Sequence, residues 1–250
     1  MTNPTDFIWA EWPASANIRA LTTTRAGGVS QGAYSSLNLA DHVDDNLIDV
    51  EKNRQILAEQ LKIEQPVWLK QVHGVQVVDA STAMHHEVAD AVYSLQPDTV
   101  CAVLTADCLP LLFCNQQATK VAAAHAGWRG LADGVIESTV DTLQENPEDI
   151  MVWLGPAIGA SCFEVGQDVY DAFVLQDNSA KSAFSKVDAE HYLADIYHLA
   201  RLRLKKLGIE KVYGGGLCTY TDEDRFYSFR KNKITGRMAS MIWISSEEKI

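Results

Sequence analysis

The sequence predicts an α/β fold, layered in the α+β manner, in which mixed β-sheets are flanked by helices. Short runs rich in β-branched and apolar residues recur along the whole chain, which excludes an all-helical protein. Segments with helical spacing lie between these runs, so strands and helices are interleaved. The runs 67–72 and 75–78 follow one another closely, which indicates an antiparallel hairpin rather than a strand–helix–strand unit.

The expected strands are all short apolar runs bounded by polar residues, glycine or proline. They lie at 18–24, 67–72, 75–78, 100–105, 109–113, 120–124, 150–154, 212–215 and 238–244.

Three segments have the spacing of amphipathic helices. Residues 47–62 place apolar side chains on one stripe, and Asp44, Asp45 or Asn46 could cap the start. A second helix follows Gly130 and extends to about residue 143. A third is expected over 190–207, ending at Gly208 with lysines in its last turn, where cations suit the helix dipole.

Length and composition predict a soluble cytoplasmic protein. With 250 residues and no linker-like, repetitive or low-complexity stretch, we expect a single compact domain over 1–250 that folds without disulfides or structural metal. The net charge of −12 opposes binding to nucleic acid or to an anionic membrane surface. No apolar run approaches the roughly 20 residues of a membrane helix, and no export signal precedes the five cysteines, which we expect to be reduced. The oligomeric state is not predicted.

Three potential metal ligands each follow or end an apolar strand-like run: His73, Cys108 and His125. They lie 35 and 17 positions apart, so only the fold could bring them together. Taken singly, such a cysteine or histidine is usually part of the core. Together, two imidazoles and one thiolate make a three-ligand set, the number that catalytic zinc uses while keeping a fourth position open.

The same atoms allow a metal-free alternative. Cys108 could be a nucleophile activated by His125, with Asp107 orienting or competing. A thiolate bound to zinc is not free to attack an acyl carbon, so the two hypotheses exclude each other. A non-catalytic metal-binding or nucleotide-binding protein is a third possibility.

Several segments are candidates for binding an anion. Near the N-terminus, Arg25 precedes a glycine-rich stretch with Asn38 nearby, a composition that exposes backbone N–H groups. Arg129 follows His125 and precedes a predicted helix, whose first amides could bind an anion with it. The segment 225–237 gathers Arg230 and other basic residues in an otherwise acidic chain. For each of these, a solvated loop or turn is the structural alternative.

The motifs QVHG, TADCLP, AAAHAGWRG, LGPAIG, RFYSFR and TGRMAS occur in fixed order between about residues 22 and 244. On these motifs the chain resembles the YfiH-type laccase-domain family, also described as polyphenol oxidase or purine nucleoside phosphorylase. The resemblance implies a compact α/β domain distantly similar to cysteine hydrolases. It also implies that the metal ligands are His73, Cys108 and His125.

The resemblance further implies a purine nucleoside enzyme. Its expected reactions are phosphorolysis of adenosine, inosine, guanosine and methylthioadenosine, and deamination of adenosine. We expect zinc as the cofactor, with copper as a possible occupant, since raw affinity favours copper. For the deamination, Asp107 is the candidate proton shuttle beside Cys108 and His125. Arg25, Asn38, Arg129 and Arg230 are candidates for binding phosphate or substrate.

A copper-dependent laccase is disfavoured by the histidine count. Blue-copper and trinuclear sites need more imidazoles than one three-ligand set supplies, and the chain has seven His in all, none in an HxH pair.

Overall fold

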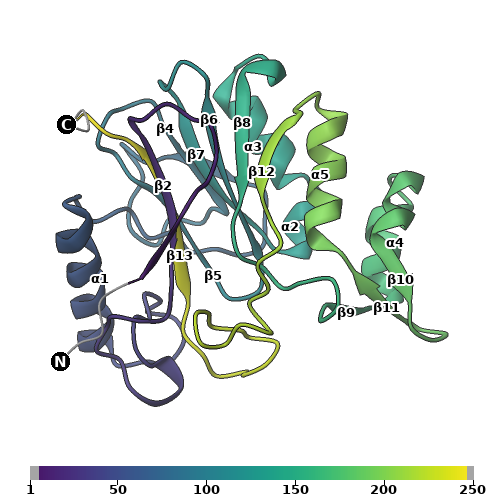
Figure 1. Ribbon diagram of the computed structural model, residues 1–250, viewed down its shortest axis with the longest axis horizontal. Coiled ribbons are helices and arrows are strands. Elements are labelled where there is room, and N and C mark those ends of the chain that lie inside the picture. Colours follow the sequence, from purple (N-terminus) through teal and green to yellow (C-terminus); the bar gives the residue numbers. More distant parts are fainter. Residues whose placement is uncertain (1–5, 247–250) are drawn as a thin grey trace.

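Two large β-sheets pack face to face in the computed structural model, which describes residues 6–246, and helices cover both outer faces (Figure 1). The four-stranded sheet has the order β1 (Phe7–Trp9), β2 (Ile18–Thr23), β13 (Met238–Ile244), β5 (Cys101–Thr105). The six-stranded sheet has the order β12 (Lys211–Gly214), β8 (Ile150–Leu154), β6 (Leu109–Asn115), β7 (Val121–Ala126), β4 (Ala91–Ser94), β3 (Val77–Asp79). Its β12–β8 and β3–β4 pairs are parallel and its other pairs antiparallel, so the predicted mixed sheets are confirmed.

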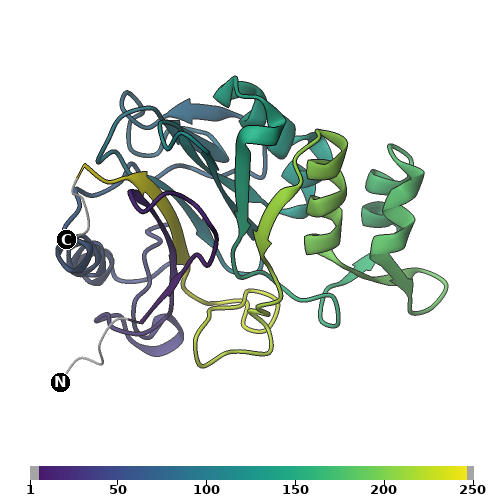
Figure 2. The same ribbon diagram turned by 45° about the horizontal axis from the view of Figure 1, so that its top comes forward.

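Five α-helices accompany the sheets. They are α1 (Leu47–Leu61), α2 (Trp128–Asp133), α3 (Val135–Leu143), α4 (Gln167–Val174) and α5 (Ile196–Lys206), with 3₁₀ turns at Gly32–Tyr34, Pro147–Asp149 and Asn178–Ala183. A smaller sheet of β10 (Phe184–Lys186), β11 (His191–Ala194) and β9 (Glu164–Gly166) forms with α4 an arm that projects beyond α5 (Figures 1 and 2). Within residues 6–246, none of the helices combines the length and the apolar character needed to cross a bilayer.

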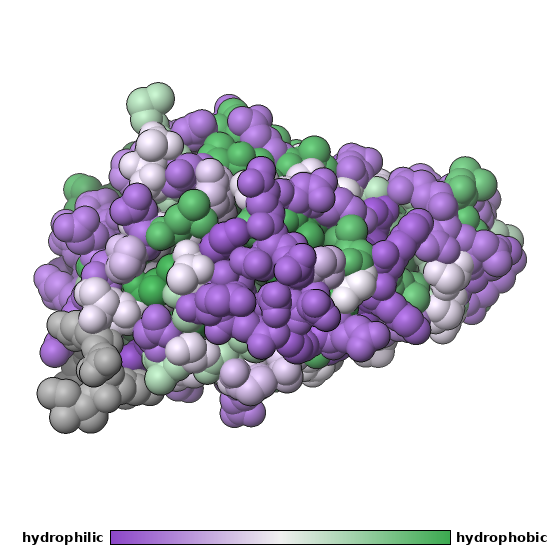
Figure 3. All heavy atoms as spheres, turned by 90° about the horizontal axis from the view of Figure 1, so that it is seen from above, coloured by the Kyte–Doolittle hydropathy of each residue, from purple (hydrophilic) through white to green (hydrophobic). Residues whose placement is uncertain are grey.

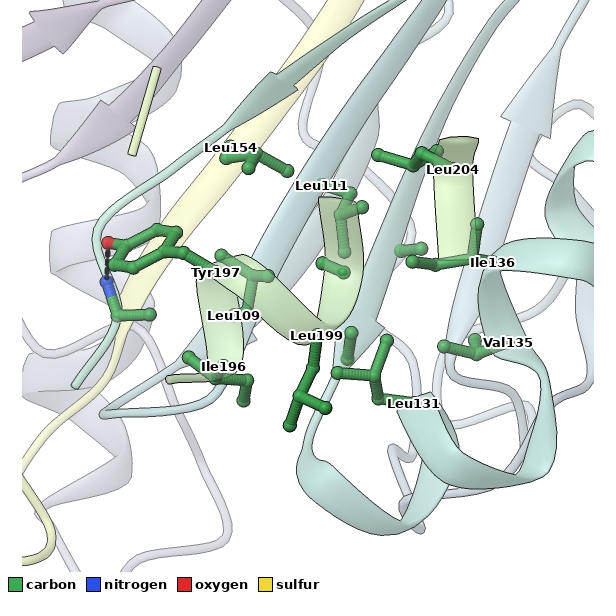
Figure 4. Close-up of a cluster of buried hydrophobic side chains, with 14 of the residues drawn as sticks. Leu109, Leu111, Leu131, Val135, Ile136, Leu154, Ile196, Tyr197, Leu199 and Leu204 are labelled. Carbon is green, nitrogen blue, oxygen red and sulfur yellow. Dashed lines mark hydrogen bonds between the residues drawn. The ribbon is translucent and has the colours of Figure 1, made fainter. Parts of the chain in front are cut away.

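Alternation along the central strands builds separate cores on the two faces of each sheet. In β6, Leu109 and Leu111 pack against the helices, whereas Leu112 and Cys114 pack into the layer between the sheets. Figure 4 shows the helix-side core, where side chains of β6 and β8 meet those of α2, α3 and α5. Each central strand is therefore buried on both faces, which explains its continuous apolar sequence.

Helix α1 follows the prediction closely. Asn46 is the N-cap, and its side chain accepts a hydrogen bond from the Ile48 N–H at 2.9 Å. The helix covers the outer face of the four-stranded sheet, where Leu57 joins a core with Leu21 and Met241.

The predicted hairpin of 67–72 and 75–78 is wrong. Residues 67–72 form only an isolated bridge between Lys70 and Val88, and β3 pairs in parallel with β4, which the sequence analysis did not predict. The backbone before β3 instead donates hydrogen bonds to a buried carboxylate, Asp90, which replaces the ladder that a hairpin would provide.

Two predicted helices have different bounds. The helix expected over 190–207 begins at Ile196, because residues His191–Ala194 form β11 and Asp195 caps the helix by accepting from the His198 N–H. The helix after Gly130 starts earlier, at Trp128, and breaks at Gly134, whose φ of +103° belongs to the left-handed region that glycine tolerates. The five cysteines are free thiols, as expected.

Hydrophilic side chains cover much of the face shown in Figure 3, and apolar ones form small separate patches. The loops between β12 and β13, drawn yellow-green, gather at one end of the two large sheets (Figures 1 and 2).

Candidate metal centre

Three side chains with metal-binding atoms meet close to the ends of the central strands. His73 lies in the turn before β3, Cys108 in the turn between β5 and β6, and His125 in β7. Their ligand atoms all lie within 4.8 Å of one another, and Cys108 Sγ is 3.7 Å from His73 Nε2. The structure thus brings together three residues that lie far apart in the sequence.

Strand register explains why His125 and Cys108 converge. His125 shares a strand face with Val121 and Ala123, which point into the layer between the sheets. It lies opposite Pro110 in the β6–β7 pair, two residues beyond Cys108. The antiparallel pairing therefore places the thiol at the β6 terminus beside the imidazole.

Asp90 orients both histidines. It is fully buried, and the Nδ1–H of His125 donates to its Oδ1 at 2.8 Å, which leaves Nε2 free to bind an ion. The N–H groups of Val72, His73 and Gly74 donate to the same carboxylate at 3.1, 2.9 and 2.7 Å. These bonds hold His73 in its left-handed conformation, with φ of +62°. Burial acts to raise the pKa of Asp90, but these hydrogen bonds and His125 lower it below its usual value.

The absence of a side chain at Gly127 leaves space for the side chains of His73 and Cys108. A Cβ at this position would lie 2.4 Å from His73 Cδ2 and 3.1 Å from Cys108 Sγ. A Cβ at Gly130 would lie 2.7 Å from the carbonyl oxygen of Gly74. The glycines of the GWRG segment are thus needed because the turn that carries His73 packs directly against them.

The donor set and its spacing fit a tetrahedral ion. Bond lengths of about 2.3 Å to sulfur and 2.0 Å to nitrogen place tetrahedral sulfur and nitrogen ligands roughly 3.5 Å apart. The observed 3.7 Å between Cys108 and His73 is close to this value. One thiolate and two imidazoles suit zinc, and three protein ligands leave a fourth position for another group.

The cluster favours a thiolate. Burial acts to raise the pKa of Cys108, but the neighbouring His125 and His73 lower it to about 6. Burial likewise acts to lower the pKa of His125, but Cys108 and Asp90 raise it above its usual value. A thiolate is the form that binds metal, and it is also the form that acts as a nucleophile.

A pocket of about 210 Å³ opens beside Cys108. Its lining combines aromatic and apolar side chains with two cations and one acid: Ala106, Asp107, Cys108, Trp128, Ile158, Phe163, Ile196, Phe229, Arg230 and Lys233. Such a lining suits a ligand that has both a flat apolar part and an anionic part.

Asp107 lies in this pocket wall, but both of its carboxylate oxygens are engaged. Oδ1 accepts from the Thr219 hydroxyl and Oδ2 from the Arg230 N–H, each at 2.6 Å. The carboxylate therefore ties two loops that follow β12 to the turn before β6. Its predicted role as a proton shuttle stays a prediction.

Arg25 and Asn38 form hydrogen bonds with loop backbone, and their expected roles in binding phosphate or substrate stay predictions. Arg25 donates to the carbonyl oxygens of Ser35 and Glu223, and its guanidinium packs over Tyr227. Asn38 is fully buried and accepts from the backbone N–H groups of Ala40 and Arg237. Neither residue lines the pocket beside Cys108.

Arg129 and Arg230 lie nearer the cluster. Arg129 is exposed and packs over the ring of Trp128, a pocket residue. Arg230 lines the pocket itself, packs over Phe163 and donates through Nη1 to the Glu164 carbonyl.

Sequence analysis missed Asp90 and the aromatic lining of the pocket. A carboxylate directly before the short apolar run 91–94 was the available signal for Asp90, but that run was not predicted as a strand. Phe163 and Phe229 come from loops whose meeting depends on the whole fold.

Comparison with known proteins agrees with these motifs. Residues 19–245 match the family described as multi-copper polyphenol oxidoreductase laccase. The chain belongs to this family. The resemblance deduced from the motifs is therefore confirmed, and the laccase-like family accounts for most of the chain.

Members similar to this chain include the purine nucleoside phosphorylase PA4543 of Pseudomonas aeruginosa, 53% identical with 95% of this chain and 98% of that protein covered. The purine nucleoside phosphorylase YfiH of Escherichia coli is 52% identical, with the same coverage. Among solved structures, protein NMB0706 of Neisseria meningitidis superposes with a TM-score of 0.93 at 50% identity, covering 96% of this chain and 99% of that one. The hypothetical protein YfiH of Bacillus licheniformis gives 0.86 at 32% identity, with 91% and 93% covered.

Proposed function

We propose that this chain is a purine nucleoside phosphorylase that works at the His73–Cys108–His125 cluster and the adjoining pocket. The observation that carries the proposal is the opening of a pocket with aromatic and cationic walls directly beside Cys108. The names of the similar proteins from P. aeruginosa and E. coli support it.

Phosphorolysis exchanges one bond for another. An oxygen of inorganic phosphate forms a bond to C1′ of the ribose, and the bond from C1′ to the purine nitrogen breaks. The bonding electrons leave with the base, which takes up a proton, and the sugar phosphate is released. The protein must therefore hold a flat base, a sugar and an anion at once.

The pocket offers groups for the base and for the anion. Trp128, Phe163 and Phe229 can pack against a purine, which stacks on aromatic rings. Arg230 and the nearby Arg129 supply positive charge for phosphate. Asp107 holds the Arg230 loop against the pocket through the backbone. We include adenosine, inosine, guanosine and methylthioadenosine among the proposed substrates.

We propose zinc as the metal, held by His73, Cys108 and His125, with copper as a possible occupant. Bound zinc supplies a Lewis acid that polarises an oxygen or lowers the pKa of bound water. Asp90 keeps the ring of His125 oriented toward the cluster and fixes the turn that carries His73. Deamination of adenosine at the same pocket is part of the proposal, with Asp107 as the candidate for moving a proton beside Cys108 and His125.

A second function is favoured by a specific arrangement. Cys108, His125 and Asp90 form a thiol–imidazole–carboxylate series of the kind that activates a nucleophile. A metal-free cysteine hydrolase acting on an amide would use it. Stoichiometric labelling of Cys108 by iodoacetamide in the purified protein, with no zinc present, would favour this alternative.

A copper-dependent polyphenol oxidase remains disfavoured. Among residues 6–246, His73, Cys108 and His125 are the one group of three or more potential ligands close enough to hold an ion. Electron transfer to oxygen through several coppers needs more such sites.

Metal analysis combined with a phosphate-dependence assay tests the proposal. We expect about one zinc per chain, and release of hypoxanthine from inosine or adenine from adenosine only when phosphate is present. Cys108→Ala should lose both metal and turnover. If metal-loaded protein releases no base in excess phosphate, the proposed function is wrong. If Cys108→Ala keeps its turnover, the His73–Cys108–His125 cluster is not part of the active site.

A further inference from the structure

Two cations of the segment 228–237, Lys233 and Arg237, pack against the ring of Phe229. Phe229 is 45% exposed and lines the pocket, and Lys233 Nζ and Arg237 Cζ lie 5.0 and 5.7 Å from its ring centroid. Within residues 6–246, neither cation has an acidic side chain in ion-pair distance. Lys231, on the same segment, instead pairs with Glu223 at 2.8 Å.

Part of the Arg237 guanidinium has no hydrogen-bond acceptor among the described residues 6–246. Its Nη1 donates to the carbonyl oxygens of Thr235 and Gly236 at 2.9 and 3.0 Å. Its Nε and Nη2 donate to no atom in the described part of the chain, residues 6–246. The side chain is half-buried, and its backbone N–H is fixed by Asn38 Oδ1 at 2.9 Å. A fixed guanidinium with a free edge matches the geometry of a phosphate oxyanion.

Arg237 also lies within electrostatic range of the cluster. Burial lowers the pKa of Arg237, and the negative charges of Cys108 and Asp107 oppose that shift. Since the whole chain has a net charge of −12, a phosphate needs a local positive surface to approach the pocket. Lys233 and Phe229 line the pocket beside Cys108, and Arg237, which is not itself a lining residue, packs on the ring of Phe229.

We propose that Arg237 and Lys233 form the binding site for the inorganic phosphate co-substrate at the Phe229 side of the pocket. Arg237 donates through Nε and Nη2, and Lys233 adds charge at the mouth. This inference rests on the proposed phosphorylase function and adds two direct ligands to the positive charge of Arg230 and Arg129. It prefers Arg237 to Arg25, whose Nε and Nη1 donate to backbone carbonyl groups and which lies outside the pocket lining.

Steady-state kinetics with phosphate and inosine varied separately test the site. Arg237→Gln should raise the KM for phosphate by about 10- to 100-fold, because the charge-assisted contact of the guanidinium with phosphate is lost. The dissociation constant of inosine and the zinc content should stay within about twofold of the wild type. Lys233→Met should give a smaller rise of the same kind. Lys231→Met, whose cation is paired with Glu223, is the matched control and should leave the phosphate KM unchanged.

Direct titration of inorganic phosphate by calorimetry separates this inference from the proposed function. If wild type shows no phosphorolysis but binds phosphate, and Arg237→Gln does not, the anion site stands while the phosphorylase proposal fails. If wild type turns over and Arg237→Gln keeps its phosphate KM, or weakens inosine and phosphate equally, the site assignment is overturned. Arg237→Lys keeps the charge without the planar fork and serves if the glutamine variant does not fold. It should raise the phosphate KM above that of the wild type, and an unchanged KM would also overturn the assignment.

Discussion

Asp90 links the two histidines of the cluster through one buried carboxylate. Four donors converge on it: the ring of His125 and three consecutive N–H groups around His73. Because a single residue fixes the orientation of one ligand and the backbone of another, metal affinity depends on a side chain that does not bind the ion.

We therefore expect Asp90→Asn to weaken zinc binding by about 10- to 100-fold. The amide keeps the size of the side chain but loses its negative charge. Its NH₂ group cannot accept the hydrogen bonds that the carboxylate receives from His125 and from the backbone around His73. Competition with a chromophoric chelator measures the affinity. Glu145→Gln, which alters an acid bonded to Asn115, is the control, and equal zinc affinity in the two variants would contradict the role assigned to Asp90.

Gly127→Ala tests the steric argument at the same scale. The added methyl group would lie 2.4 Å from His73 Cδ2, so His73 must move and the variant should lose most of its zinc. Elemental analysis of the purified protein checks the result. At Gly32 no atom of the described residues beyond its two chain neighbours lies within 4 Å of an added Cβ, so Gly32→Ala should retain its metal despite the strain of a φ of +59°. A Gly127→Ala protein with full zinc content would refute the close packing.

Sequence reasoning found the three ligands because each follows or ends an apolar run, and strand ends present side chains to pockets. It could not find the roles of Asp90 and Gly127. Those roles depend on contacts between turns that lie 17 or more residues apart, such as Asp90 with His73 and Gly127 with His73. Local composition carries no signal for such contacts.

Elements buried on both faces were the most predictable. Strands β5, β6, β7, β8 and β13 are continuous apolar runs, and each appears close to its predicted position. Short strands of the small sheet were not: β11 was predicted as the start of α5, since Leu193, Ile196 and Leu199 continue a helical spacing across Asp195. Tertiary pairing with β9 and β10 decides that segment, and periodicity alone cannot detect it.

Helix α1 is hydrogen-bonded to the loop 36–39, and this loop in turn contacts the basic segment 228–237. Its Asn53 donates to the carbonyl oxygens of Ser36 and Asn38, and Arg54 donates to Leu39. Asn38 in turn fixes the backbone of Arg237. The stability of this helix therefore supports the position of Arg237.

Asn46→Ala should lower the free energy of unfolding by about 1 kcal/mol, because the N–H of Ile48 loses its acceptor. Urea denaturation measures this change. Asn46→Asp keeps a capping oxygen and should remain within about 0.5 kcal/mol of the wild type. If both variants were equally destabilised, the cap would not be the cause.

Across the whole molecule, the cluster sits beside two cores that do not depend on it. The helix-side core and the layer between the sheets are built from apolar side chains, and none of the three ligands belongs to either group. A chain of this length buries about three quarters of the surface that it exposes when unfolded. Its folding energy therefore comes from packing rather than from metal coordination.

Metal removal should consequently leave the fold intact. We expect chelated protein to keep its far-UV circular dichroism and to lose roughly 5–10 °C in Tm, since an ion present at about 100 times its Kd stabilises the native state by about 2.7 kcal/mol. Readdition of zinc should restore the Tm of the wild type but should not change the Tm of Cys108→Ala. This comparison separates zinc binding at the cluster from zinc binding elsewhere. Collapse of the helical signal on chelation would mean that the ion holds the structure together, and the two sheets would then be unable to fold on their own packing.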